Sequence, residues 1–189
     1  MKRGIIIGVL GLALMSVTQA VASITIDFES FPAGPFAAHT EQGVTFSASG
    51  GGGAIITGLT PNGTLGLLDT NALRKELRAD IGPGATFVSV ELGDYDADSD
   101  RLFLEAFDAG DNLLASVSTV IATDFTGMVT LGIGAPNIAY AVFGARDAVD
   151  GSSVFADNFT FEPIPAPGAI LLGSIGVGLV SWLRRRRTL

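Results

Sequence analysis

Cysteine is absent from this sequence of 189 residues and histidine is nearly so, and both shortages exclude functions. Without cysteine the chain has no disulfide, no thiol nucleophile and no cysteine metal site, so its stability must come from its core. The sequence contains no Gly-X-Ser-X-Gly motif, so the single histidine, His39, has no such serine nucleophile for which it could act as a catalytic base. We therefore expect a solvated histidine and a protein that is not an enzyme.

Positive charge is scarce in the middle of the chain. Six of the eleven lysines and arginines lie near the two ends, whereas all nineteen acidic residues lie between residues 23 and 162. That stretch therefore has five basic residues and a formal net charge of −14. Nucleic acid is excluded as a partner, because binding it requires a basic surface. The many carboxylates indicate solubility outside the cell, divalent cations as ligands, or both.

Both ends of the chain are apolar runs with basic flanks. Lys2 and Arg3, the apolar run 4–17 and the small residues that end at Ala22 predict a signal peptide over residues 1–22. At the other end, the uncharged run 169–183 leads into four arginines, a pattern that predicts a transmembrane helix with its cationic end in the cytoplasm. Such a helix spans only roughly 22 Å of a ~30 Å hydrocarbon core, so we expect a weak and temporary anchor.

The tail has three parts: a Pro-X-Pro motif, the apolar run and the arginine cluster. The residues concerned are Pro165, Ala166, Pro167, Arg184, Arg185, Arg186 and Arg187. This arrangement resembles the PEP-CTERM sorting signal, with alanine where the family has glutamate, and it covers residues 163–189. The resemblance implies processing by an exosortase-like membrane protease at the inner membrane, and delivery to the cell envelope, the cell surface or the outside. A plain single-pass tail anchor remains the alternative.

The stretch 23–162 is long enough for one domain with a core, and its pattern predicts an all-β fold. Short apolar segments separated by Gly, Pro, Asn or Asp predict strands, among them 73–78, 87–92, 128–131 and 138–143. Apolar and polar residues alternate in several of them, as in Val88, Val90 and Leu92. So many short strands favour an antiparallel two-layer β-sandwich.

Alternating aspartates mark one loop between predicted strands. They are Asp94, Asp96, Asp98 and Asp100, with Tyr95 among them. Ca²⁺ takes six to eight oxygen ligands in forgiving geometry, so the loop is a candidate calcium site. The spacing does not fit an EF-hand, and a solvated acidic turn explains the loop equally well.

A further carboxylate lies in the last predicted strand, 154–161. Strict alternation places Asp157 on the same face as Phe155, Phe159 and Phe161, and a buried carboxylate needs a partner or a metal. The opening Asp27-Phe28-Glu29 and the closing Asp157-Asn158-Phe159-Thr160-Phe161 resemble the jelly-roll, galactose-binding-like or carbohydrate-module-like domains that precede PEP-CTERM tails. The resemblance implies a jelly roll with a structural Ca²⁺ between its first and last strands, held by Glu29 and Asp157, with Asp27 as a substitute.

These features predict an exported cell-surface or matrix protein of structural or adhesive type, sorted by an exosortase-like system. One alternative is a carbohydrate-binding module for the envelope or an exopolysaccharide, with Tyr95 as the aromatic contact. A second alternative is a glycan-active hydrolase, which requires a cleft with two carboxylates about 5–9.5 Å apart.

Overall fold

The computed structural model describes residues 22–49, 55–70, 75–95, 99–146, 154–165 and 167–186. The predicted signal peptide, apart from Ala22, lies outside these residues. Asp96 and Asp98 of the acidic loop also lie outside them, as do Ala166 and Arg187 of the predicted sorting signal.

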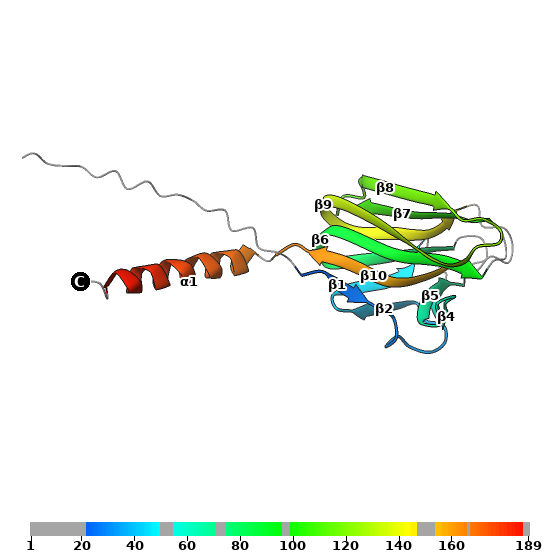
Figure 1. Cartoon of the computed structure of the whole chain (residues 1–189), viewed down its shortest axis with the longest axis horizontal. Coiled ribbons are helices and arrows are strands. Elements are labelled where there is room, and N and C mark those ends of the chain that lie inside the picture. Colours follow the sequence, from blue (N-terminus) through cyan, green and yellow to red (C-terminus); the bar gives the residue numbers. More distant parts are fainter. Residues whose placement is uncertain are drawn as a thin grey trace, which may run out of the picture.

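The described residues form strands and one helix, which projects away from the strands (Figure 1). In chain order the elements are β1 (Ile24–Ile26), β2 (Ala38–Glu41), β3 (Val44–Ala48), β4 (Ile55–Leu59), β5 (Leu65–Asp69), β6 (Lys75–Tyr95), β7 (Arg101–Phe107), β8 (Leu113–Val120), β9 (Thr126–Arg146), β10 (Phe155–Pro163) and α1 (Pro167–Arg186). All pairings between these strands are antiparallel, which confirms the predicted fold class.

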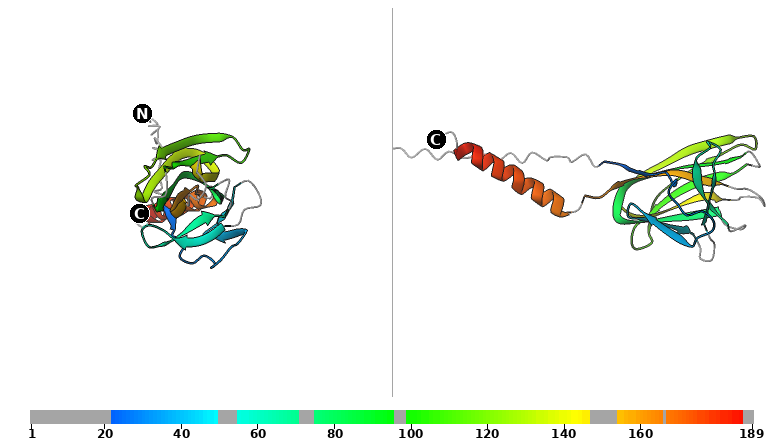
Figure 2. Two further views of the ribbon diagram at one scale, coloured as in Figure 1. Left: turned by 90° about the vertical axis from the view of Figure 1, so that its right-hand side faces the viewer. Right: turned by 90° about the horizontal axis from the view of Figure 1, so that it is seen from below.

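Two long strands, β6 and β9, are shared between two layers of the domain and run along its length (Figures 1 and 2). The first half of β6 pairs with β3 and with the second half of β9. The second half of β6 pairs with β10 and with the first half of β9. The first layer therefore has the order β4-β5-β10-β6-β9 with β1 beside β10, and the second layer has the order β2-β3-β6-β9-β7-β8.

Strand β6 continues through Gly82-Pro83-Gly84, where the sequence predicts an interruption. The predicted strands 73–78 and 87–92 are therefore parts of one strand, and 128–131 and 138–143 are likewise parts of β9. The pairing register with β9 shifts between Asp80 and Ala85, so the ladder is broken where β6 passes from one layer to the other. Proline lacks an amide hydrogen and fits such a break, and Gly84 adopts a φ of 70° there.

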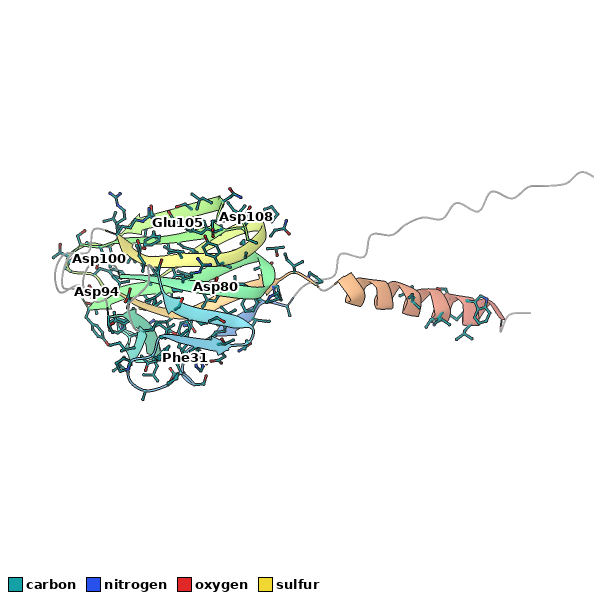
Figure 3. All side chains as sticks on the ribbon, turned by 180° about the vertical axis from the view of Figure 1, so that it is seen from behind. Phe31, Asp80, Asp94, Asp100, Glu105 and Asp108 are labelled. Atoms are coloured by element: carbon teal, nitrogen blue, oxygen red, sulfur yellow. The ribbon has the colours of Figure 1, made fainter. Side chains whose placement is uncertain are left out.

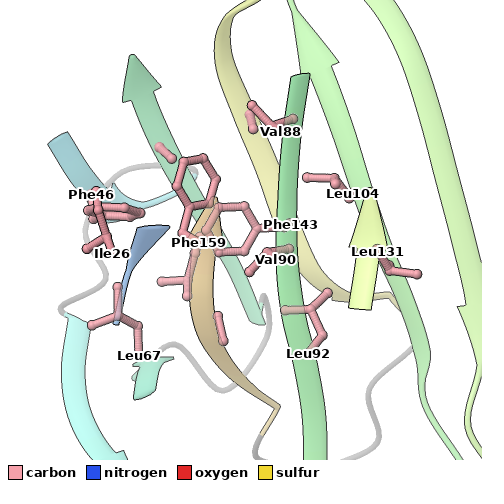
Figure 4. Packing of buried hydrophobic residues seen from close by; sticks show 14 of the residues in the cluster. Ile26, Phe46, Leu67, Val88, Val90, Leu92, Leu104, Leu131, Phe143 and Phe159 are labelled. Atoms are coloured by element: carbon pink, nitrogen blue, oxygen red, sulfur yellow. The ribbon is translucent and has the colours of Figure 1, made fainter. Parts of the chain in front are cut away.

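The inward side chains of both layers meet in one hydrophobic core (Figure 4). Val88, Val90 and Leu92 of β6 are fully buried, as their alternation predicts. The ring of Phe159 lies edge-on to that of Phe46, with 5.3 Å between the ring centroids. Truncating a buried phenylalanine to alanine costs about 3–5 kcal/mol, so these rings stabilise a domain that has no disulfides.

A bulge in β10 corrects the predicted face of Asp157. Asn158 has a φ of 49°, and the register against β6 shifts between Asp157 and Thr160. The shift turns Phe159 into the core, whereas Phe155 and Asp157 lie on the outer side of the first layer. The expectation that Asp157 shares a face with Phe159 and Phe161 is therefore wrong, because strict alternation fails at the left-handed residue.

The helix predicted at the C-terminal end is present as α1. However, none of the helices formed by the described residues is long and apolar enough to cross a membrane. The prediction of a transmembrane helix is therefore not supported. The uncharged run 169–183 is shorter than the ~20 residues that a bilayer requires, and it is diluted by Gly173, Gly176 and Gly178.

Candidate functional site

The outer face of the second layer gathers charged and aromatic side chains from β6, β9 and β7. Asp80 pairs with Tyr140, and Tyr140 pairs with Phe107 on its other side. Paired residues of an antiparallel ladder point to the same side of the sheet, so these three share one face. Tyr140 is buried yet does not belong to the core cluster, which places its ring on the outside. We call this surface the arginine–tyrosine face, formed by Arg78, Asp80, Phe103, Glu105, Phe107, Tyr140 and Arg146.

Arg78 and Tyr140 form the centre of the arginine–tyrosine face. Arg78 Nε donates to the two carboxylate oxygens of Asp80 at 2.9 and 3.0 Å, and its Nη2 donates to Oδ1 at 2.6 Å. The guanidinium lies over the Tyr140 ring, 3.6 Å from the centroid. Phe107 stacks on the same ring with 4.8 Å between centroids and 6° between planes. The Tyr140 hydroxyl donates to Asp111 Oδ1 at 2.9 Å, so every part of this side chain is held.

The protonation states of this pair are fixed by its surroundings. The hydrogen bonds with Asp80 raise the pKa of Arg78 above its ordinary value. Burial raises the pKa of Tyr140, and the hydrogen bond to Asp111 adds to the effect. Arg78 is therefore charged and Tyr140 neutral throughout the neutral pH range.

A second arginine repeats the arrangement further along β9. Arg146 Nη2 lies 2.7 Å from Glu105 Oε2, and its guanidinium lies 4.3 Å from the centroid of the Phe103 ring. The side chains of Arg146 and Asp80 are each 46% exposed, and that of Arg78 is 34% exposed. Two paired guanidinium groups are therefore braced by aromatic rings and still accessible to a ligand. The sequence gives no sign of this face, because its residues come from strands that only the fold places side by side.

The predicted ligands Glu29 and Asp157 both contact the turn before β5. The Thr64 hydroxyl donates to Asp157 Oδ2 at 2.6 Å, and the next amide, that of Leu65, donates to Glu29 Oε1 at 2.9 Å. The Asn158 amide donates to Asp157 Oδ1 at 2.7 Å, and its side chain donates to Glu91 Oε2 at 3.1 Å. Glu91, which pairs with Asp157 across the ladder, is not among the residues predicted from the sequence.

Asp157 is buried, and burial raises the pKa of its carboxyl. The hydrogen bonds from Thr64 and Asn158 oppose this shift, and the negative charges of Glu91 and Glu29 add to it. The expectation that a buried Asp157 needs partners is therefore met by hydrogen bonds. Whether it also holds a metal ion stays a prediction.

The two described aspartates of the acidic loop, Asp94 and Asp100, lie at the end of the domain away from Asp80 (Figure 3). Asp94 near the end of β6 and Asp100 before β7 are both buried there, and Figure 3 shows them at the same end. Asp69 at the end of β5 is buried as well, and it is not among the residues predicted from the sequence. Within the described ranges, no group of three or more acidic or histidine side chains is placed to hold a metal ion.

The parts of the predicted sorting signal that the structure describes lie at and beyond the end of the strand domain. Pro165 follows β10, Pro167 begins α1, and Arg184, Arg185 and Arg186 end it. His39 lies on β2 and not in a loop, and its partly exposed ring packs against that of Phe31, with 4.3 Å between the ring centroids.

No family model matches the sequence, and no curated protein matches it either. Several solved structures are similar to part of this chain. The K3 cleaved adhesin domain of Lys-gingipain from Porphyromonas gingivalis is 13% identical, with a TM-score of 0.47, over 74% of this chain and 98% of its own. The carbohydrate-binding module CBM27-1 of Caldicellulosiruptor saccharolyticus, solved with mannohexaose, is 15% identical, with a TM-score of 0.48, over 78% of this chain and 100% of its own. The CBM22-1 xylan-binding domain of Xyn10C from Paenibacillus barcinonensis is 13% identical, with a TM-score of 0.47, over 78% of this chain and 97% of its own.

Proposed function

We propose that this chain is an exported, non-catalytic domain that binds glycans and acts by adhesion. The observation that carries the proposal is the arginine–tyrosine face, where Arg78, Arg146 and Asp80 are each between a third and a half exposed beside aromatic rings, while Glu105 is 13% exposed. Ligand sites combine aromatic side chains with a few well-placed polar groups. Guanidinium donors and carboxylate acceptors are planar forks, which can each contact two neighbouring hydroxyl groups of a sugar.

The arrangement of this face reduces the cost of binding. Arg78 is fixed by three hydrogen bonds to Asp80 and by the Tyr140 ring before any ligand arrives. Immobilising a long side chain on binding costs about 0.5–1.5 kcal/mol, and here the fold has already ordered it. The face is therefore prepared for a rigid, hydroxyl-rich partner.

The charge balance of the face favours a neutral polysaccharide. Arg78 is paired with Asp80 and Arg146 with Glu105, so the two pairs carry no net charge. Arg101, opposite Arg146 in the ladder, adds an exposed cation at the rim of this face, but the acidic surface of the rest of the domain would repel an anionic polymer. Binding should therefore change little with ionic strength, because screening weakens only unbalanced charges.

The carboxylates argue against the hydrolase alternative. A general acid needs a raised pKa and contact with the substrate, and Asp157 has the raised pKa but is only 1% exposed. Asp80 is accessible but hydrogen-bonded to Arg78, and Glu105 is only 13% exposed and paired with Arg146. The geometry thus supports binding rather than glycoside cleavage.

A glycan array probed with the full chain in detergent tests the proposal, followed by calorimetry with the neutral oligosaccharide bound best. Asp80→Ala and Arg146→Ala should each weaken binding about tenfold or more, because each frees a partner charge on the face. Asp124→Ala removes an exposed charge from the loop after β8 and should leave binding unchanged. Full binding by both face variants would refute the proposal.

We also propose that the tail addresses the protein to an exosortase-like protease at the cell envelope. The Pro-X-Pro motif, the helix and the terminal arginines support this assignment, and Pro165 and Pro167 flank the junction between β10 and α1. Mass spectrometry of the mature protein should find a C-terminus near Pro165. An intact chain that ends at Leu189 in the envelope fraction would contradict cleavage.

We further propose a structural Ca²⁺ ion at the acidic end of the domain. The burial of Asp94 and Asp100 supports it, since a carboxylate withdrawn from water is compensated by hydrogen bonds, such as that from the Tyr95 amide to Asp94, or by a cation. The described side chains alone do not form a group of three ligands, and the predicted ligands Asp96 and Asp98 lie outside the described residues. Glu29 and Asp157 form the second candidate position.

A further inference from the structure

Strand β8 forms an open edge of the second layer. It pairs with β7 on one side, and no described strand pairs with its other side. The register with β7 is regular from Ala115 to Val120, after a bulge at the start of the strand. Its sequence, Leu113–Val120, contains no charge, proline or glycine, and Val120 is 62% exposed. Such an edge presents a row of backbone donors and acceptors to another strand.

The other edges of the described sheet are closed, short or interrupted. Phe36 and Ile55 form a bridge between the segment before β2 and the start of β4, which joins the two layers on that side. Strands β2 and β4 have only four and five residues. The first half of β9 has no second neighbour among the described strands, but Gly127, Gly132 and Gly134 interrupt it. Strand β8 is therefore the edge best suited to pairing.

Charges at the two ends of β8 are arranged for pairing with a second copy. The turn before the strand carries Asp108, and Arg101, opposite Val120 in the ladder, lies at its other end. Arg101 is exposed and forms no ion pair with a described residue. In an antiparallel pair of two β8 strands, the acidic turn of each copy lies beside the Arg101 of the other. Asp124 lies in the loop after β8, so the self-complementarity rests on the uncharged strand and on the approach of Arg101, one strand away on β7, toward the acidic turn of the other copy.

We propose that two copies of this chain associate edge to edge through antiparallel β8 strands. The twofold axis of such a pair is perpendicular to the sheet, so the second layers of both copies form one continuous sheet. Because β8 neighbours β7 in this layer, both arginine–tyrosine faces then lie on the same side. This last consequence rests on the proposed glycan-binding function, whereas the association itself does not.

In the dimer, the two binding faces can bind one polysaccharide chain bivalently. Two sites on one rigid surface can engage the same polysaccharide, and the second contact forms at high effective concentration. Avidity then exceeds the affinity of one site by about 10²-fold or more. A weak single site would therefore suffice for adhesion.

Sedimentation velocity of the full chain in detergent tests the association with a charge-swap pair. Ser118 is exposed on β8 and points to the outer side, because it pairs with Phe103. Ser118→Asp and Ser118→Lys place like charges near one another across the twofold axis. Each variant alone should dimerise about tenfold more weakly, and an equimolar mixture of the two should recover dimers. Ala38→Asp on β2 makes the same change on another exposed strand and should dimerise as the original chain does.

Two results would overturn the inference. The first is a chain that stays monomeric at all concentrations tested, and the second is a mixture of the Ser118 variants that dimerises no better than each alone. Association through α1 would produce the second result. Glycan affinity is measured separately by calorimetry with a short oligosaccharide that occupies one site. An original chain that stays monomeric but binds the oligosaccharide would therefore overturn this inference and leave the proposed function intact.

Discussion

Truncating Tyr140 tests whether the arginine–tyrosine face is an ordered unit. The Tyr140→Ala variant removes the ring between Arg78 and Phe107 and the hydrogen bond to Asp111. A buried aromatic ring contributes about 3–5 kcal/mol against alanine, which includes the stacking of about 0.5–1.5 kcal/mol. The outer position lowers this figure, because the site can be refilled by water. We therefore expect a loss of about 2–4 kcal/mol in the free energy of unfolding.

The hydroxyl can be separated from the ring by Tyr140→Phe. This change keeps both stacking partners and removes only the hydrogen bond to Asp111, so it should cost about 0.5–1.5 kcal/mol. Tyr95→Phe is the matched control on the other layer, because the Tyr95 hydroxyl donates to the Leu59 carbonyl at 2.8 Å and its ring is 43% exposed. It should cost less, since water can replace the lost bond.

Urea unfolding followed by fluorescence and circular dichroism measures these differences, and calorimetry measures glycan binding on the same samples. Tyr140→Ala should lose binding as well as stability, because Arg78 is no longer held over a ring. Tyr140→Phe should retain most of the affinity. A Tyr140→Ala variant that unfolds within about 0.5 kcal/mol of the original chain would refute the reasoning, since no buried stack could then exist.

Three further outcomes follow from the structure. Burial raises the pKa of Asp157, so the folded state binds the proton of this carboxyl more tightly than the unfolded chain does. Asp157 therefore adds stability as pH falls through its folded pKa, and this contribution is lost as pH rises. Asp157→Asn should abolish this part of the pH dependence and raise the melting temperature at neutral pH, and an unchanged pH profile would contradict the prediction. Gly93→Ala should lower the free energy of unfolding by about 1–3 kcal/mol or more, because a Cβ there would collide with the Gly127 carbonyl. The control Gly176→Ala in α1 meets open space and should not destabilise the chain. Equal melting temperatures for the two variants would argue against the β6–β9 contact. Excess EDTA should lower the melting temperature of the full chain relative to excess Ca²⁺ if the proposed ion is bound, since a ligand of the native state stabilises it by mass action, and identical curves would remove the calcium proposal.

The sequence predicts the elements of this fold better than its connections. Alternation correctly places Val88, Val90 and Leu92 inside, because it reports the local strand pleat. It fails at Asn158, where one left-handed residue reverses the faces of β10. The predicted strand end at Pro83 is also wrong. A proline between glycines ends a strand in most local contexts, and only the pairing of β6 with β9 before and after Pro83 shows that the strand continues.

The candidate sites also divide into features that are local in the sequence and contacts that only the fold creates. Asp157 is visible in the sequence as a carboxylate within an apolar strand, and its partners from Thr64 and Asn158 satisfy the expectation that it is compensated. Arg78 and Tyr140 are 62 positions apart, and only the ladder between β6 and β9 brings them together. A single sequence has no local signal for such a contact, which depends on how two bent strands are aligned.

The uncharged edge of β8 needs an explanation in a domain that is otherwise acidic. A regular, exposed edge without charges promotes uncontrolled pairing, and proteins usually blunt it with a lysine, a proline or a short strand. A twofold antiparallel pair prevents uncontrolled pairing in another way. The β8 edge of each copy is hydrogen-bonded to that of the other, so no free β8 edge remains to bind a third copy. The glycine-interrupted half of β9 offers no comparable second edge. Association through β8 should therefore stop at two copies, and a twofold dimer, rather than a fibre, is the assembly that this sheet favours.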